Sequence, residues 1–237
     1  MKDINATIII NLEGKNQEEI WRNVKYTRRK YVQQAQKSGL YYEKSEKSEI
    51  NLKEMYEMNM DTFKEGGIAV WTYEKWKDFV SPAGDKFFFV KIDKEKVGCF
   101  VLTEITKEFY KSGLKIGNKG IRPLVFATKK KFNNYRPNDY LYWITIKYSL
   151  DNKYDFVDLG GWQIKARGHV KNINSFKEEW GGEIQYYYWD YPILTAIRRK
   201  LIRNFTFFWH INNFLKKFWK RRYSVHDKYV KDATARN

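Results

Sequence analysis

The chain has 237 residues, 43% of them hydrophobic, which is enough for one large domain with its own core and excludes a fully disordered protein. Its single cysteine, Cys99, excludes a disulfide framework and a cysteine-rich zinc site, and three scattered histidines argue against a histidine-based metal site. The formal net charge of +17 predicts an anionic partner, either a membrane surface, a nucleic acid or a phosphorylated substrate, unless the charge only solvates the surface.

The first third of the chain predicts a strand followed by helices. Ala6–Leu12 is apolar like a strand and too short for a secretory signal, which favours a cytoplasmic protein. Asn16, with Glu19 three residues later, predicts a capped helix. That helix ends near Ser38, because Gly39 suits a left-handed stop. The next predicted elements are a short strand from Tyr41, a helix from Ser48 to Gly66-Gly67, and a short helix from Thr72 that ends before Pro82.

Beyond Pro82 the hydrophobic spacing changes from a helical period to a strand period. Two strand-like segments, 86–92 and 97–105, flank a polar turn and predict a hairpin. The remaining predicted elements are a strand over 120–128, a basic loop over 129–136, a helix from Pro137 to about Leu150, and strands over 154–159 and 184–191. An antiparallel meander followed by β-α-β indicates an α+β domain rather than a doubly wound sheet.

An acidic residue and a glycine pair end the predicted strand at 154–159. Gly160 and Gly161 allow a ligand to approach the backbone closely. Asp158, at the strand end, is the first candidate for a general base, and Lys177 could polarise an acyl carbonyl. His169 has a suitable pKa range, although a loop histidine is more often a surface residue. For each of these side chains a solvent-facing or structural role is the competing interpretation.

Arg28 falls in the middle of an apolar stripe on the first predicted helix. A charge in that position needs a partner. It either pairs with a buried carboxylate for structure, or faces a cleft where its guanidinium holds phosphate or carboxylate with two hydrogen bonds.

The predicted loop at 129–136 carries four basic residues just before a helix. Unpaired N–H groups and the helix dipole favour an anion at such a position, so the loop is a candidate donor-binding site. A solvated surface loop is the alternative. The candidate donor-binding residues in and around it are Phe126, Lys130, Lys131, Arg136 and Asn138.

The C-terminal segment is the most basic part of the chain. Residues 191–222 hold nine Lys/Arg and no acidic residue. A helix there would carry Ile193, Ile197 and Leu201 on an apolar face. It would carry Arg199 and Arg203 on the opposite face, as in helices that lie on an anionic membrane. Packing on its own domain or on a second subunit is an equal alternative, and RNA contact is a third.

Four segments together resemble the Fem-type peptidoglycan-bridge aminoacyltransferases and the related FemAB-like branch of the GNAT acyltransferases. The segments are Tyr26 to Leu40, Tyr140–Trp143, Tyr154–Gly161, and Phe176-Lys177 with Trp180-Gly181-Gly182. The resemblance covers most of residues 7–191. It implies one GNAT-like domain over residues 1–191, with a mixed, centrally splayed sheet flanked by helices. Residues 192–237 would then be a basic amphipathic helical tail.

The resemblance also implies a reaction. An acyl or aminoacyl group would pass from acyl-CoA or aminoacyl-tRNA, without a metal, to an amine of a nucleotide- or lipid-linked cell-envelope precursor. Asp158 and Lys177 would be catalytic, and the donor would lie near residues 126–137. The implied substrate-binding residues are Arg28, Gly160, Gly161, Trp162, His169 and Phe176.

Two departures accompany the resemblance. The chain has room for about one such domain, whereas full Fem proteins pair two, and the segment 129–136 lacks the glycine-rich pyrophosphate motif of acetyl-CoA-dependent GNAT proteins. The alternative function, of a different class, is a catalytically silent module that binds RNA or anionic lipid through the same cleft and the tail over 192–222.

Overall fold

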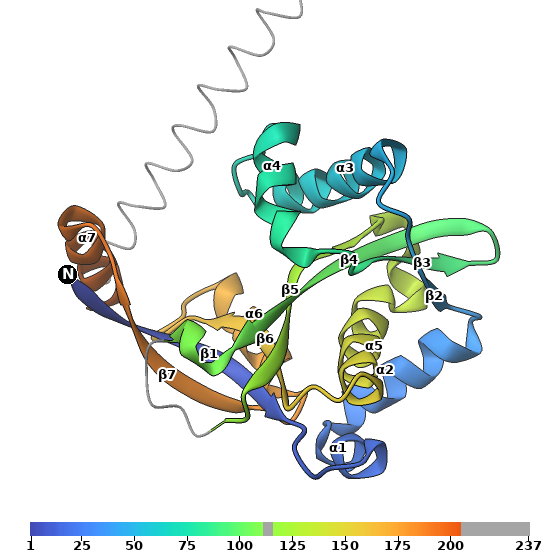
Figure 1. Cartoon of the computed structure of the whole chain (residues 1–237), viewed down its shortest axis with the longest axis horizontal. Coiled ribbons are helices and arrows are strands. Elements are labelled where there is room, and N and C mark those ends of the chain that lie inside the picture. Colours follow the sequence, from blue (N-terminus) through green and yellow to red (C-terminus); the bar gives the residue numbers. More distant parts are fainter. Residues whose placement is uncertain (111–115, 205–237) are drawn as a thin grey trace, which may run out of the picture.

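A computed structural model describes residues 1–110 and 116–204, and these fold around one seven-stranded sheet (Figure 1). The strands are β1 (Lys2–Asn11), β2 (Tyr41–Lys44), β3 (Phe87–Ile92), β4 (Glu95–Thr106), β5 (Lys119–Thr128), β6 (Phe156–Trp162) and β7 (Glu183–Asp190). Their order across the sheet is β2-β3-β4-β5-β6-β1-β7, and β5 with β6 is the parallel pair. This mixed sheet confirms the predicted α+β, GNAT-like class.

Helices cover both faces of the sheet. They are α1 (Gln17–Asn23), α2 (Tyr26–Lys37), α3 (Glu49–Glu65), α4 (Tyr73–Val80), α5 (Pro137–Asp151), α6 (His169–Glu178) and α7 (Ile193–Asn204). Short 3-10 turns are η1 (Ser81–Ala83), η2 (Lys107–Tyr110) and η3 (Lys130–Tyr135). In Figure 1, α3 and α4 lie on one side of the sheet, and α2 and α5 lie on the other.

Four predictions about these elements were wrong in detail. The predicted helix from Asn16 to Ser38 is two helices, because Val24 is extended and the Lys25 amide donates to the Glu179 carbonyl, 2.9 Å away. Strand β1 begins four residues earlier than expected. The predicted basic loop forms the turn η3. The segment around His169 is helical, and its start was missed because Gly168 offers no side-chain cap.

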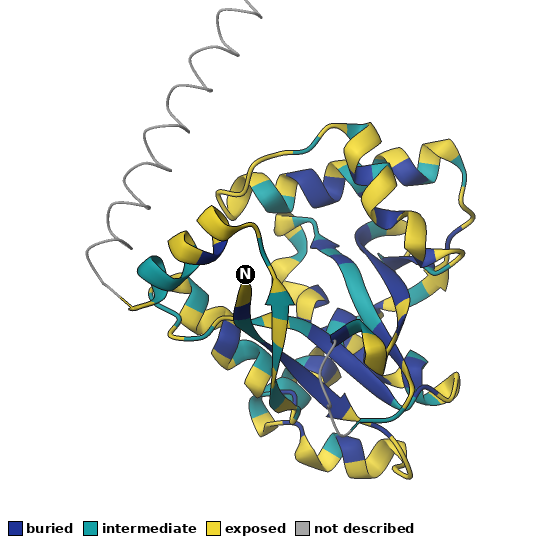
Figure 2. Cartoon of the chain, turned by 60° about the vertical axis from the view of Figure 1, so that its left-hand side comes forward, coloured by how far each residue is buried: buried dark blue, intermediate teal, exposed yellow. Residues whose placement is uncertain are grey.

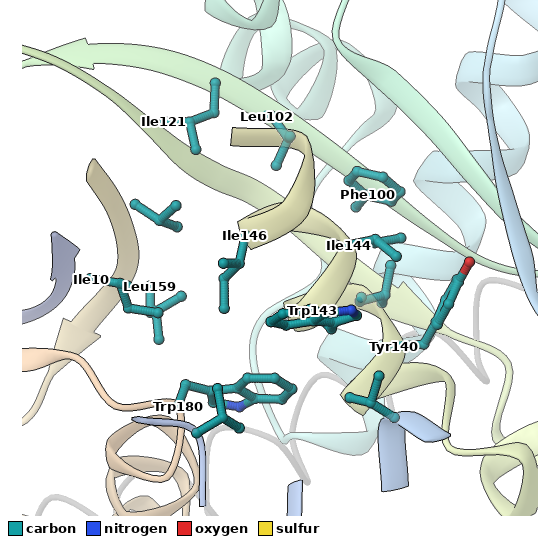
Figure 3. Close-up of a cluster of buried hydrophobic side chains, with 14 of the residues drawn as sticks. Ile10, Phe100, Leu102, Ile121, Tyr140, Trp143, Ile144, Ile146, Leu159 and Trp180 are labelled. Atoms are coloured by element: carbon teal, nitrogen blue, oxygen red, sulfur yellow. The ribbon is translucent and has the colours of Figure 1, made fainter. Parts of the chain in front are cut away.

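The largest core cluster lies between the sheet and the helices α2 and α5 (Figure 3). Helix α5 is buried nearly all round, and Trp143 and Ile146 from it pack toward Leu102 and Leu159 of the strands. A second cluster, with Trp76 and Phe89, fills the space beneath α3 and α4. Figure 2 shows the central strands as buried and the outer sides of most helices as exposed.

The parallel pair β5 and β6 parts soon after it forms. The pair is joined at Gly120–Phe156 and at Ile121–Val157, while both strands continue for several residues. A side chain at position 120 would place its Cβ 2.2 Å from the Phe156 ring, so this close approach requires glycine. The residues after this point on each strand face an opening in the middle of the sheet.

The predicted tail is described only as far as residue 204. Its first part is the helix α7, and the rest of the predicted amphipathic helix lies outside the described residues. Among the helices that are described, none has the length and apolar content needed to cross a membrane.

Candidate active site

Asp158 lies where β5 and β6 part, and its side chain is fully buried. Oδ1 accepts hydrogen bonds from the Thr7 hydroxyl and from the Gly160 amide, the latter at 2.8 Å. Oδ2 accepts from the Tyr110 hydroxyl at 2.8 Å and lies 3.6 Å from Nε of Arg122. A buried carboxylate survives when its oxygens are bonded in this way.

Lys177 reaches the same point from α6. Its ammonium donates to the Gly161 carbonyl at 3.0 Å, and a Cβ on Gly160 would lie 3.4 Å from it. Burial lowers the pKa of Lys177 to about 8, which the carboxylate of Asp158 partly opposes and the charge of Arg122 reinforces. The structure thus brings together four residues that the sequence proposed separately.

Three partners of Asp158 were missed from the sequence. Thr7 lies on β1, Tyr110 ends η2, and Arg122 is on β5, so the chain brings them together only by folding. Burial raises the pKa of the Tyr110 hydroxyl, which stays protonated and able to donate. A signal for Thr7 exists in the alternation of polar residues Asp3, Asn5 and Thr7, which share one face of a strand.

Arg28 is paired within the protein. Its guanidinium lies 2.6 Å from Oδ1 of Asp139 and 2.8 Å from Oε2 of Glu179, with 14% of its side chain exposed. It also stacks 4.9 Å from the ring centroids of Tyr31 and Phe176. This is the structural alternative that the apolar stripe allowed, because Arg28 joins α2 to α5 and α6 and has two carboxylates of its own.

The other predicted substrate-binding residues lie along α6 and the end of β6. The Trp162 indole donates to Oε1 of Glu178 at 2.6 Å. Phe176 packs against Tyr142, 5.0 Å between ring centroids. His169 is exposed at the first turn of α6. These three surround the Asp158–Lys177 centre without any contact to its carboxylate being formed.

Solved structures share this architecture at low sequence identity. FemX superposes with a TM-score of 0.63 and 15% identity over 84% of this chain and 64% of that chain. L-PGS from Bacillus licheniformis gives 0.53 and 12% over 86% and 67%, respectively. The C-terminal domain of a lysylphosphatidylglycerol synthetase from Agrobacterium fabrum gives 0.52 and 10% over 79% and 60%.

The fold is that of the FemAB-like GNAT proteins. The chain spans about two thirds of the length of these structures or less. At these identities the similarity concerns the fold. No protein-family profile matches the sequence, and no curated protein matches it.

In this GNAT fold the predicted donor-binding residues lie between the end of β5 and the start of α5. Phe126 packs 4.9 Å from Tyr142, and Asn138 accepts a hydrogen bond from Thr128 at 3.4 Å. Arg136 has a left-handed backbone (φ 60°) and lies 3.9 Å over the Tyr31 ring.

The basic side chains of this segment are not gathered at one point. Lys131 pairs with Glu95 of the β3–β4 hairpin at 2.6 Å, while Lys130 is exposed. The first turn of α5 already holds a buried carboxylate, Asp139, whose pKa burial raises against the opposing effect of Arg28. An anionic donor at this helix start would therefore rely on backbone N–H groups and on Lys130 and Arg136.

Two further features bound the chemistry. Among residues 1–110 and 116–204, no group of His, Cys, Asp or Glu side chains could hold a metal ion. Beside Gly161, a cavity of about 570 Å³ opens between α6 and α7. Since Gly161 accepts the hydrogen bond of Lys177, this cavity adjoins the Asp158–Lys177 centre.

Proposed function

We propose that the protein transfers an acyl or aminoacyl group to an amine where β5 and β6 part. The observation that carries the proposal is the charge cluster at this point. Asp158 is paired with Arg122 at 3.6 Å, and the half-buried ammonium of Lys177 adds a second positive charge beside it. A fixed cation in a partly dry site stabilises the negative charge that develops on a carbonyl oxygen during acyl transfer.

In the proposed reaction the amine nitrogen attacks the carbonyl carbon of the donor. The C–O bond of an aminoacyl-tRNA, or the C–S bond of an acyl-CoA, breaks, and the proton from the amine leaves with the departing group. Lys177 stabilises the oxyanion. Both oxygens of Asp158 are occupied by hydrogen bonds, so we assign it a positioning role, holding Gly160 and the charge of Lys177, in place of the general-base role.

The acceptor that we propose is an amine on a nucleotide- or lipid-linked cell-envelope precursor, with acyl-CoA or aminoacyl-tRNA as donor. Support for this class comes from the fold shared with FemX and with a lysylphosphatidylglycerol synthetase domain. We place the reaction in the cytoplasm beside an anionic membrane, which the basic residues 192–222 would hold by charge. A silent lipid- or RNA-binding module is the second candidate, favoured by the exposed apolar residues Ile193, Leu194 and Ile197 of α7.

A transfer assay separates the two candidates. The full chain is incubated with labelled aminoacyl-tRNA or acyl-CoA and with nucleotide- or lipid-linked precursors, and amide products are read by mass spectrometry. Lys177→Met should lower the rate by roughly 10²–10³-fold, as loss of one oxyanion-stabilising group does. Lys177→Arg keeps the charge and is the matched control. Binding of precursor without any product from either donor class would leave the binding module as the function.

A further inference from the structure

The cavity between α6 and α7 carries more positive charge than the protein itself neutralises. Arg198, Arg199 and Arg203 line it, and no carboxylate does. The nearest acid is Asp3, fully buried behind the cavity wall, which lies 3.1 Å from Arg199 and 2.8 Å from Arg203. Three cations and one carboxylate leave an excess of about two positive charges at this wall.

The arginines are held in place before any ligand arrives. Arg199 also donates to Oδ1 of Asn5 at 2.7 Å, and Arg203 to the Ile4 carbonyl at 3.2 Å. Burial alone would raise the pKa of Asp3, but the hydrogen bonds from Arg203 and Arg199 outweigh it and lower that pKa. The clamp therefore stays charged at neutral pH, and α7 forms a fixed wall of the cavity.

The rest of the cavity is apolar, and its edge continues into an apolar surface. Lining side chains include Ile164, Val170, Ile173 and Ile202. On the outside of α7, Leu194 is 82% exposed and lies one turn before Arg198. The first half of this helix is mostly exposed in Figure 2. A ligand that fits both parts is an amphiphile with an anionic group.

We infer that this cavity binds the phosphate ester of a lipid, with the phosphate on the arginines and the chain against the apolar edge of α7. Phosphate is the preferred anion because its charge matches the excess of two, and its oxygens match the guanidinium fork. The binding site stands without any reaction. Its use as the acceptor's phosphate, one residue from Gly160 and beside Lys177, rests on the proposed function.

The test is calorimetric titration of the full chain with dihexanoyl phosphatidic acid, below its micelle concentration, and with glycerol 3-phosphate. Thr195 lines the cavity, is exposed and takes no part in the Asp3 clamp, so Thr195→Glu adds a negative charge there, while Thr195→Gln is the uncharged control of equal size. Thr195→Glu should weaken binding by roughly tenfold or more, since it opposes charge-assisted hydrogen bonds, and Thr195→Gln should not. Arg198→Gln should also weaken it, whereas Lys30→Gln, an exposed charge on α2, should not.

Equal binding by the two Thr195 variants would overturn the site, as would the absence of binding by wild type. Glycerol 3-phosphate binding as tightly as the lipid would support the phosphate site and overturn the lipid as its source. Lys177→Met should leave lipid binding unchanged, because Lys177 does not line the cavity. A failure of the transfer reaction with every donor would therefore not affect this result.

Discussion

Replacing Asp158 by Asn isolates the role of the buried carboxylate at the split of the sheet. Asn has the same shape but no charge, and only one of its two terminal groups accepts hydrogen bonds. If its carbonyl takes the place of Oδ1, it keeps the bonds from Thr7 and Gly160. Its NH₂ group then faces the Tyr110 hydroxyl and the guanidinium of Arg122, where an acceptor is required.

The magnitude follows from these contacts. Hydrogen bonds to a charged group contribute about 1.5–3 kcal/mol each, and removing one partner of a buried ion pair costs roughly 3–5 kcal/mol. We therefore expect Asp158→Asn to lower the free energy of unfolding by about 3–5 kcal/mol, which is a large part of a typical stability of roughly 5–15 kcal/mol. For a chain of this size that is a fall in Tm of roughly 6–20 °C.

Urea unfolding and thermal melts of the purified full chain measure this effect. Tyr110→Phe removes one donor and is the graded control, with an expected loss of about 1–2 kcal/mol. In a double-mutant cycle the two changes should couple, since they share a bond. A Tm for Asp158→Asn within 2 °C of wild type would refute the view that this carboxylate is a clamp, and would return it to candidacy as a general base.

Three other changes follow from the same contacts. Transfer by wild type should fall as pH rises through about 8, where the cationic form of Lys177 is lost, and Lys177→Arg should move this fall to a higher pH; a rate that increases with pH would contradict the oxyanion role. Gly120→Val should lower stability by about 1–3 kcal/mol in urea melts, because its side chain would overlap the Phe156 ring. Arg28→Met should lower the Tm but leave precursor affinity within about threefold, since Asp139 loses its partner while the cavity is untouched; a lost affinity at unchanged Tm would restore Arg28 to substrate binding.

Local chemistry made the helices and strands predictable. The Ser48 and Thr72 side chains cap α3 and α4 as their sequences indicate, and the position of Pro137 marks the start of α5. Such signals act within a few residues, so they need no knowledge of the fold. Gly168, by contrast, carries no capping side chain, and α6 was missed for that reason.

The site was only half predictable, because its other half depends on long-range contacts. Asp158 and Gly160 are neighbours in sequence, but the Thr7 hydroxyl comes from 151 residues away. The partner of Arg28 is 111 residues away, and no spacing rule selects Asp139 over other acids. For α7, the helical wheel was sound, but the face that packs is the basic one, because Asp3 awaits Arg199 and Arg203 there.

Strand β1 shows why this part of the molecule serves a site. It lies between β6 and β7 in the sheet, where an apolar residue at each inward position would give a stable core. Instead Asp3, Asn5 and Thr7 alternate along one face, and each bonds a different partner, from the arginines of α7 to Asp158. Buried polar chains of this kind are costly unless every member is satisfied, and they gain nothing over hydrophobic packing as pure scaffold. This row connects the wall of the arginine-lined cavity to the split of β5 and β6. We therefore infer that it is kept to hold these two places in a fixed relation.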